Sequence, residues 1–360
     1  MLIKQTPQDF VVEEITPDGT VLEAGATPVF AGGSGEHLVF VLEKQDWDTI
    51  AAVSEVAKRL HCSEKRLGFA GTKDRRALTA QRCSVWKLTP EQLAGVKIKD
   101  ILLKPLCYGE RVGLGDLQGN RFTITVRDFH GKGEMPGTIP NFFGPQRFGE
   151  TRPITHLVGK AIVTGRFHDA VDIYLFDTFD TDRDRELRTS CRGDYAKALR
   201  EYPTKLRYER MLLEALARNP HNYTGALRAL PRKLLVMFVH AYQSHLFNRV
   251  LEKRLERGLE PREGDVLEGG VPTGPLYGVD CPLASGEQGK VERAVLEAEW
   301  LQLTDFVIHG MPDLTSKGMR RPLTVQLTGF EVLERGEDWM KVRFSLPKGC
   351  YATTALDYLK

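Results

Sequence analysis

Apolar residues alternate with polar ones in several short stretches of the N-terminal third, which is the period of a β-strand. Residues 9–15 form one β-rich run, and a second follows the Gly-rich loop AGGSG. Residues 119–129 show the alternation most clearly and predict a half-buried strand. Across residues 48–60 the apolar spacing is instead that of a helix, which Asp48 or Thr49 caps. The N-terminal third is therefore expected to build a sheet with a packed helix.

The middle of the chain has a different pattern. Residues 155–175, 185–216 and 231–257 carry mostly helical periodicity, with few strand signals between them. Near the C-terminus, LTVQLTGFEVL and MKVRFSLP are typical of strands on either side of a turn at residues 335–338. The simplest topology is an α+β fold, in which a mixed sheet with flanking helices is interrupted by a mainly helical insertion.

Composition narrows the class of protein. The chain has 360 residues, of which 41% are hydrophobic and 27% charged, and these are ordinary values for a folded globular protein. The longest apolar run, residues 234–239, is far too short to cross a bilayer, and the first residues lack the apolar stretch of a secretion signal. We therefore expect a cytoplasmic protein with no membrane segment.

The cysteines and histidines give no sign of a metal site. The closest two of the six cysteines, Cys62 and Cys83, are 21 residues apart, which fits reduced thiols better than zinc-binding pairs. His240 and His245 are five residues apart, a spacing that does not align them on one helical face. We predict that the protein binds no metal.

The net charge of only +2 means that any binding of nucleic acid has to come from local basic patches. Residues 183–210 are one candidate, because nine Lys and Arg side chains are interleaved there with Tyr195, Tyr202 and Tyr208. Acidic residues in the same stretch offset much of the charge, which favours a solvated helical face over an RNA-binding surface.

The segment GFAGTKDRRALTAQ, residues 68–81, concentrates charged groups in a turn between two predicted strands. Its glycines are too close together for a phosphate-binding P-loop, and a strand-like run follows it instead of a helix. Asp74 is either a turn residue that accepts local hydrogen bonds or a reactive carboxylate. The neighbouring Lys73, Arg75 and Arg76 favour the second interpretation, since these cations hold a carboxylate in its ionised form and also bind RNA phosphates.

The segment NFFGPQRFGE, residues 141–150, places aromatic rings beside side-chain amides and Arg147. Such residues are often buried in a tight turn. They are also the groups that stack on an extruded base and bind its edge in enzymes that modify nucleotides. A predicted buried helix, residues 230–255, carries the polar residues Tyr242, Gln243, Ser244 and Asn248, which need hydrogen-bond partners and are expected to tie this helix to the sheet domain.

Six segments occur in one order along nearly the whole chain: PQDFVVEE, AGTKDRRALTAQ, GDLQGNRFTI, NFFGPQRFG, AYQSHLFN and LPKGCYATTAL. Together they resemble the TruD family of tRNA pseudouridine synthases. The resemblance implies a catalytic pseudouridine-synthase domain over residues 1–153 and 318–360 and a TRUD insertion domain over residues 154–317. It also implies isomerisation of a uridine in tRNA, usually at position 13.

The resemblance assigns roles to individual residues. Asp74 matches the catalytic aspartate of the family, and Lys4 matches the basic residue that pairs with it. Asn141 and Phe143 match the active-site asparagine and the base-stacking phenylalanine. Thr72 stands where the family often has a small aliphatic residue or Gln, a departure that leaves these assignments intact. The RNA-binding residues are expected to be Lys73, Arg75, Arg76 and Arg147.

Isomerisation of uridine involves no redox change, so we expect no cofactor. We expect tRNA as the partner and a monomeric enzyme. Two alternatives remain: a non-catalytic RNA-binding or RNA-folding protein on the same scaffold, and another RNA-modifying enzyme such as a methyltransferase. The methyltransferase is the less favoured of the two, because the chain has no Gly-rich loop between a strand and a helix for a methyl donor.

Overall fold

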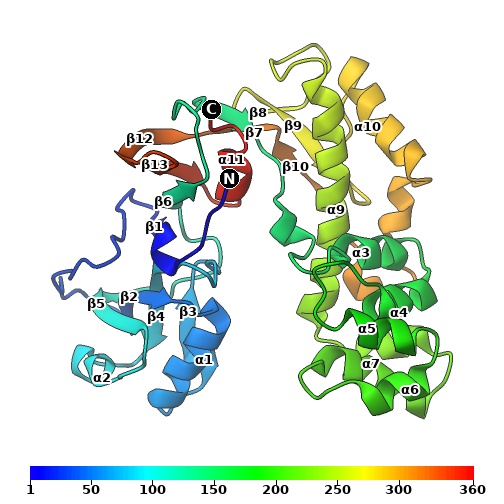
Figure 1. Cartoon of the computed structure of the whole chain (residues 1–360), viewed down its shortest axis with the longest axis horizontal. Helices are drawn as coiled ribbons and strands as arrows, with labels where there is room; N and C mark the ends of the chain where they lie inside the picture. The colour runs from blue at the N-terminus through cyan, green and yellow to red at the C-terminus, as the bar shows by residue number, and fades with distance from the viewer. The chain divides into compact units, whose positions relative to one another are not determined.

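The computed structural model describes residues 1–360, which fold as two compact units (Figure 1). Unit 1 comprises Met1–Ile139 and Val325–Lys360, and unit 2 comprises Pro140–Thr324. Residues 140–153 and 318–324, which we had expected in the sheet domain, thus belong to unit 2. The reason is local, since the backbone N–H of Asn141 donates to the carbonyl of Leu323 and residues 319–322 form a strand of unit 2.

Unit 1 contains an eight-stranded sheet with the order β12-β13-β6-β1-β4-β2-β5, and β3 pairs with β4 at its side. Strands β1 and β4 are parallel and the other pairs are antiparallel, so the sheet is mixed, as predicted. The strands are β1 (Phe10–Ile15), β2 (His37–Gln45), β3 (Leu67–Phe69), β4 (Leu78–Trp86), β5 (Ile101–Gly109), β6 (Gly119–Arg127), β12 (Thr328–Arg335) and β13 (Trp339–Pro347). The helices are α1 (Thr49–Arg59), α2 (Pro90–Ala94) and α11 (Ala352–Leu356).

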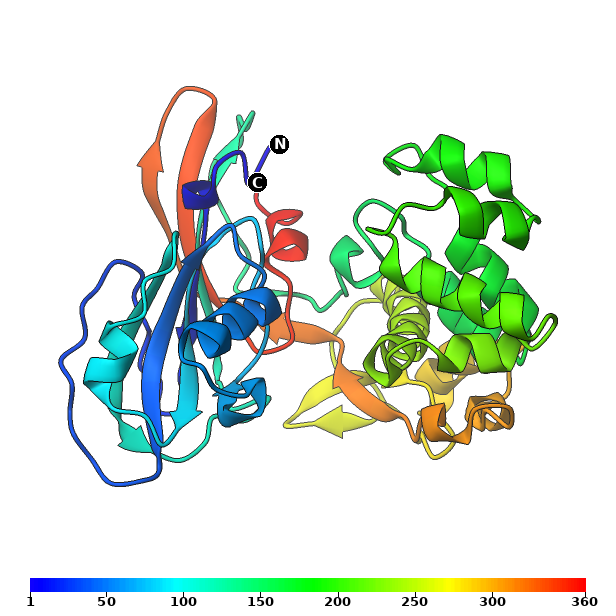
Figure 2. The same cartoon turned by 90° about the horizontal axis from the view of Figure 1, so that it is seen from below.

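Helix α1 covers one face of this sheet (Figure 2). Asp48 caps it, since its carboxylate accepts hydrogen bonds from the backbone N–H groups of the first turn, a cap that contributes about 1 kcal/mol. The buried side of the helix, including Val53 and Val56, packs against Phe40 of β2 and Val85 of β4. This packing fixes the start of α1 beside the end of β3, where the candidate site lies.

Strand β6 differs from the half-buried strand that its alternation predicts. Phe122, Ile124 and Val126 are buried in the core as expected, but Thr123 and Thr125 are buried as well. Strand β6 lies between β1 and β13, and a side chain of β13 shields its polar side, where Arg343 donates from Nε to the hydroxyl of Thr123 at 3.2 Å. Helix α11 joins the core on the apolar side.

Unit 2 is mainly helical and has a small three-stranded sheet, which the sequence pattern did not reveal. The chain passes between the units within β7 (Thr138–Pro140) and β11 (Thr324–Gln326). The elements of unit 2 are α3 (Thr155–Val163), α4 (Phe167–Phe176), α5 (Arg185–Cys191), α6 (Tyr195–Glu201), α7 (Arg207–Arg218), α8 (Tyr223–Arg228), α9 (Arg232–Leu255), α10 (Gly286–Ala298), β8 (Leu267–Glu268), β9 (Val271–Leu276) and β10 (Met319–Pro322).

Helix α9 is the central element of unit 2, and Phe238, Tyr242 and Leu246 on it are buried in the core. Helix α3 packs closely against it. Gly159 permits this approach, because a Cβ atom there would lie 2.0 Å from the carbonyl oxygen of Phe238. None of the helices of the structure combines the length and the apolar character that a membrane-spanning helix needs.

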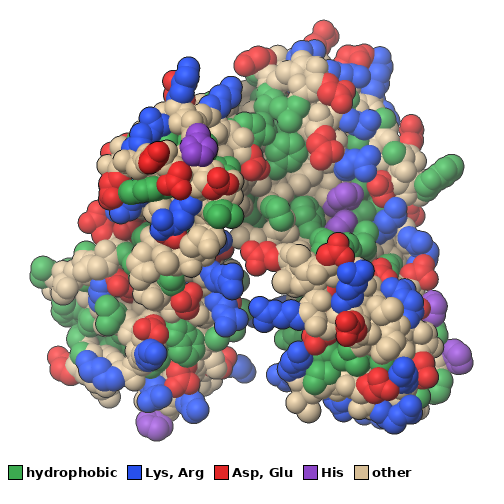
Figure 3. Space-filling view, in the orientation of Figure 1, with side chains coloured by type: hydrophobic (Ala, Val, Ile, Leu, Met, Phe, Trp, Pro, Cys, Tyr) green, Lys and Arg blue, Asp and Glu red, His purple; other side chains and the backbone are tan.

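The charge-rich stretch at residues 183–210 forms α5, α6 and the start of α7. Arg188 is buried, and its guanidinium lies 2.7 Å from Glu209 and 3.2 Å from Asp182. Tyr202 is buried too. Figure 3 shows Lys and Arg side chains interspersed with Asp and Glu over α5–α7. The structure therefore supports the solvated and internally paired face over a dedicated basic surface.

Candidate active site

Asp74 lies on the loop between β3 and β4, as the sequence predicts. Two buried polar side chains, those of Gln81 and Thr49, hydrogen-bond to the backbone of this loop. Gln81 donates its side-chain amide to the carbonyl of Gly71 at 2.9 Å, and the hydroxyl oxygen of Thr49 accepts the backbone N–H of Lys73 at 2.9 Å. The loop is thus tied to β4 and to the first residue of α1 rather than left to its own turn contacts.

Lys4 contacts Asp74 directly, and its Nζ lies 2.9 Å from Oδ1. The Lys4 side chain is 13% exposed and that of Asp74 is 29% exposed. Lys4 has a φ of 59°, a left-handed conformation that residues other than glycine rarely adopt. Its ammonium also lies 4.1 Å from the ring centre of Phe10. The pair is therefore half-buried, with the lysine held from two sides.

Lys73 does not have the position expected of an RNA-binding residue. Its side chain points into unit 1 and is 4% exposed, and its Nζ lies 2.8 Å from Oε2 of Glu14, whose side chain is fully buried. The other carboxylate oxygen of Glu14 accepts the backbone N–H of Arg82. Lys73 therefore belongs to a buried ion pair that fastens the loop to β1, and the ammonium does not reach the surface in this structure.

Arg75 and Arg76 differ from Lys73, because both are exposed. The two guanidinium groups follow directly on Asp74 in the same loop. Because both side chains are exposed, they are accessible to RNA phosphates, as the role expected of them requires.

Asn141 is buried in unit 2, and both ends of its side-chain amide have partners. Its Nδ2 donates to the carbonyl of Pro322 at 2.9 Å, and its Oδ1 accepts a hydrogen bond of 2.6 Å from Arg321. The orientation of this amide is therefore set by β10.

Phe143 is held through its backbone and its ring. Asn248 of α9 accepts from the backbone N–H of Phe143 at 3.0 Å and donates to its carbonyl at 2.9 Å. The ring packs edge-on against Phe247, and the guanidinium of Arg321 lies 4.1 Å from the ring centre. Phe143 is thus a fixed aromatic surface with a cation over the ring.

Arg147 is half-buried, and its Nε donates to the hydroxyl of Ser244 at 3.1 Å. Two of the four polar residues expected to need partners on the long helix, Ser244 and Asn248, therefore hold the segment from 143 to 147. That segment lies in unit 2, so the contacts are internal to this unit. The other two, Tyr242 and Gln243, bond to Glu299 and to the carbonyl of Tyr277.

The structure brings Lys4 and Asp74 together within unit 1, and Asn141, Phe143, Arg147 and Arg321 together within unit 2. Arg321 was missed in the sequence analysis. It is one of two arginines in GMRRPL, and its neighbour Arg320 pairs with the buried Glu292 at 2.9 Å. The strand alternation of β10 is the signal that separates the two, since neighbouring side chains point to opposite faces.

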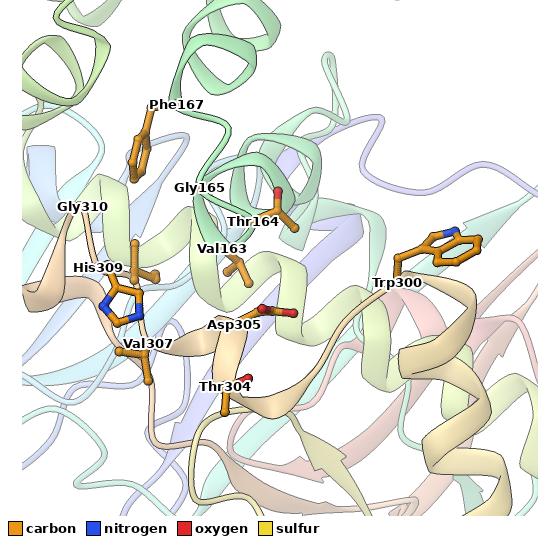
Figure 4. Close-up of a pocket in the computed structure, with 11 residues that line it drawn as sticks. Val163, Thr164, Gly165, Phe167, Trp300, Thr304, Asp305, Val307, His309 and Gly310 are labelled. Atoms are coloured by element: carbon orange, nitrogen blue, oxygen red, sulfur yellow. The ribbon is translucent and has the colours of Figure 1, made fainter.

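A separate hollow of about 570 Å³ opens in unit 2 between the end of α3 and residues 304–310 (Figure 4). Thr164, Asp305 and His309 are among the residues that line it. No sequence-predicted site residue is among its lining residues. No group of three or more His, Cys, Asp or Glu side chains in the structure is placed to hold a metal ion.

The model of the family described as tRNA pseudouridine synthase D (TruD) matches residues 1–270 and 267–357. The chain belongs to this family. Within the TruD family, a protein of Methanopyrus kandleri named probable tRNA pseudouridine synthase D is 44% identical over 345 residues, which cover 90% of this chain and 86% of the relative.

Other TruD relatives match over almost their whole length. A protein of Methanocaldococcus jannaschii named probable tRNA pseudouridine synthase D 1 is 38% identical, with 99% of this chain and 94% of the relative covered. A crystal structure of the putative TruD protein of Methanosarcina mazei superposes with a TM-score of 0.76 at 34% identity, covering 99% of this chain and 93% of that one.

Membership of the TruD family confirms the α+β pseudouridine-synthase fold and the expected class of enzyme. The chain is a tRNA pseudouridine synthase, an isomerase. Nothing in the comparisons supports the non-catalytic RNA-binding protein or the methyltransferase.

Proposed function

We propose that this chain isomerises a uridine of tRNA, at position 13, and that Asp74 is the reactive carboxylate. The observation that carries the role of Asp74 is its 2.9 Å contact with Lys4 on a loop that buried side chains hold in place. Position 13 is what the family resemblance implies. Unit 1 is then the catalytic domain, and unit 2 is the insertion typical of the family. We further propose that the enzyme works as a cytoplasmic monomer.

The reaction exchanges one glycosidic bond for another. The bond between N1 of uracil and C1′ of the ribose breaks, the base rotates while bound, and a bond from C5 to C1′ forms. The proton on C5 is lost and N1 gains one, so neither electrons nor atoms are needed from a cofactor. The base must first leave the RNA stack, at a cost of a few kcal/mol.

Asp74 has two ways to start this exchange. Its carboxylate either attacks C1′ or removes the proton from C2′ of the ribose, and both routes need an ionised, oriented carboxylate. The ammonium of Lys4 supports both, because it engages Oδ1 and offsets the negative charge. The partial exposure of the Asp74 side chain leaves the carboxylate within reach of an RNA ribose.

Asn141 and Phe143 are proposed to handle the extruded base. A phenyl ring whose backbone is fixed on both sides is a preorganised stacking surface for uracil. The ring has no proton-accepting group, so water or a further base takes the proton from C5. Asn141 is proposed to bind the sugar or the base edge next to this ring.

Binding of the tRNA backbone is assigned to Arg75 and Arg76 on the Asp74 loop and to Arg147. Contacts to phosphates release counterions, so the affinity for tRNA should fall steeply with salt. Replacement of Arg75 and Arg76 by Ala should weaken binding and lower the slope of log K against log salt by about 2, one unit for each lost contact.

The test of this function uses unmodified tRNA that carries tritium at C5 of uridine. The purified protein should release tritium into water, and mapping of the product should find pseudouridine at position 13. Release from tRNA with the map at another position would disprove the assigned uridine alone. Binding of tRNA with no release would instead favour the non-catalytic alternative.

A further inference from the structure

Lys44, close to the C-terminal end of β2, is one of the largest fully buried side chains of the protein, at 1% exposure. Its Nζ donates to two backbone carbonyls, that of Trp47 at 2.7 Å and that of Asp74 at 3.0 Å. The second carbonyl belongs to the residue proposed as the reactive carboxylate. The buried ammonium of Lys44 is therefore hydrogen-bonded to the main chain of Asp74.

The partners of Lys44 set it apart from the other enclosed lysines of unit 1. Lys73 is paired with Glu14 at 2.8 Å, and Lys104 is paired with Glu43 at 2.6 Å. Both acceptors of Lys44 are neutral. A cation buried without a direct carboxylate partner costs free energy, because two carbonyl hydrogen bonds replace only part of its hydration. Such a cost is tolerated where a function uses the group, which directs attention to Asp74.

We propose that Lys44 is a positioning residue for the isomerisation, which fixes the main chain of Asp74 so that its carboxylate stays aligned with Lys4. The inference rests on the proposed function, in which Asp74 is the reactive group. The two lysines act on different parts of Asp74, since Lys4 donates to its side-chain carboxylate and Lys44 donates to its backbone carbonyl. A misplacement of a reacting group by about 1 Å can lower a rate by about a hundredfold.

The charge on Lys44 provides a second test of this role, through the pH dependence of the rate. Burial lowers the pKa of Lys44 to about 8. Asp48 and Asp74 oppose the shift, Lys73 adds to it, and Cys83 on β4 opposes it weakly. Because the pKa lies near 8, the ammonium is present at neutral pH and is lost as the pH rises above 8. A neutral amine donates weaker hydrogen bonds and places no positive charge under the carboxylate, so the rate should fall in this range.

The experiment measures single-turnover tritium release from saturating tRNA between pH 7 and 9.5. In wild type we expect the rate to fall about tenfold above pH 8. In Lys44→Met we expect a rate at pH 7 that is ten- to a hundredfold lower and no longer falls above pH 8, with a Kd for tRNA within about twofold of wild type. Lys44→Arg, which stays charged, should be faster than Lys44→Met and should also lack the fall above pH 8.

Lys104→Met is the matched control, because it also removes an enclosed ammonium from unit 1 but leaves the loop of Asp74 untouched. This variant should keep the wild-type rate and pH profile even if it unfolds at a lower temperature. The inference is wrong if Lys44→Met keeps the wild-type rate and profile, or if both Met variants slow the reaction in proportion to their loss of stability. If the Lys44 variants do not fold, a wild-type rate that is flat to pH 9.5 overturns it.

These measurements distinguish a failure of the proposed role of Lys44 from a failure of the proposed function. If wild type releases no tritium, the proposed function fails. If wild type is active, Asp74→Asn is inactive and Lys44→Met is as fast as wild type, only the role of Lys44 fails.

Discussion

The ammonium of Lys4 lies 2.9 Å from Oδ1 of Asp74, although 70 positions separate the two residues in the sequence. Lys4 precedes β1, and Asp74 precedes β4, with which β1 pairs in parallel. Parallel pairing brings the starts of the two strands to the same edge of the sheet. The contact between the two candidate residues is therefore a consequence of the sheet topology.

Replacement of Lys4 by Met should lower the single-turnover rate by about a hundredfold, since a positioned charge next to the reactive carboxylate is lost. The affinity for tRNA should change by less than about threefold, because Lys4 is engaged with Asp74 rather than with the surface. Rate and binding are measured separately with labelled tRNA, and Lys58→Met, at an exposed lysine, serves as the control. An unchanged rate would remove Lys4 from the site.

Replacement of Lys73 by Met should lower the free energy of unfolding by about 3–5 kcal/mol, because it leaves the buried carboxylate of Glu14 without its cation. Urea unfolding measures the loss. The double variant with Glu14→Met should recover most of the stability, since both charges are then absent.

Arg76→Met provides the contrast, because Arg76 is exposed in the same loop. This variant should unfold like wild type and bind tRNA more weakly. If Lys73→Met instead kept its stability and lost affinity for tRNA, Lys73 would be an RNA contact after all and the buried pair would be unimportant.

Replacement of Arg321 by Met should slow the reaction by about ten- to a hundredfold. The guanidinium orients the amide of Asn141 and lies over the ring of Phe143, so both base-handling groups lose a support. Arg321→Met and Asn141→Ala should be strongly non-additive in a double-mutant cycle of the rate, because the residues are in direct contact. Arg257→Met, which removes a surface ion pair with Glu287, is the control. Additive effects would argue that Arg321 acts independently of Asn141.

His156 and His245 stack in unit 2 with ring centres 4.7 Å apart. Burial lowers the pKa of His156 to about 4 and also lowers that of His245. Between pH 6.5 and 4 the unfolded chain therefore binds more protons than the folded one, so stability falls as the pH falls. For His156 the loss between pH 7 and pH 5 should be on the order of 1 kcal/mol, after allowance for partial exposure.

Urea unfolding of wild type and His156→Phe at pH 7 and pH 5 tests this linkage. The difference in stability between the two pH values should be smaller in the variant, whose Phe side chain does not titrate. Equal pH dependence in both proteins would mean that His156 titrates normally in the folded state.

Some of the fold and the site could be predicted because the signals are local. Strand alternation and helical spacing located the sheet and α1, and Asp48 caps α1 as expected. The loop of Asp74 was recognisable because a charged turn separates two apolar runs. The ordered segments then pointed to the family, which the comparisons confirm.

The remaining features depend on contacts that are distant in the sequence. Lys73 and Arg76 are close neighbours with the same charge, yet one points into a carboxylate 59 residues away and the other into solvent. In the sequence, nothing separates Lys44 from other strand residues, and only the fold brings its ammonium to the backbone carbonyl of Asp74. Arg321 gains its role only because β10 lies next to the segment that begins at Asn141. Side-chain direction and long-range pairing, not residue type, decide these cases.

The central claim, that the Asp74 carboxylate carries the reaction, is tested most directly by single-turnover tritium release with Asp74→Asn. The amide keeps the shape of the side chain but cannot be the anion, and Asp100→Asn at another exposed turn of unit 1 is the matched control. We predict that Asp74→Asn binds tRNA with near wild-type affinity and releases no measurable tritium, while Asp100→Asn is fully active. Release by Asp74→Asn at a rate within about tenfold of wild type would contradict the account.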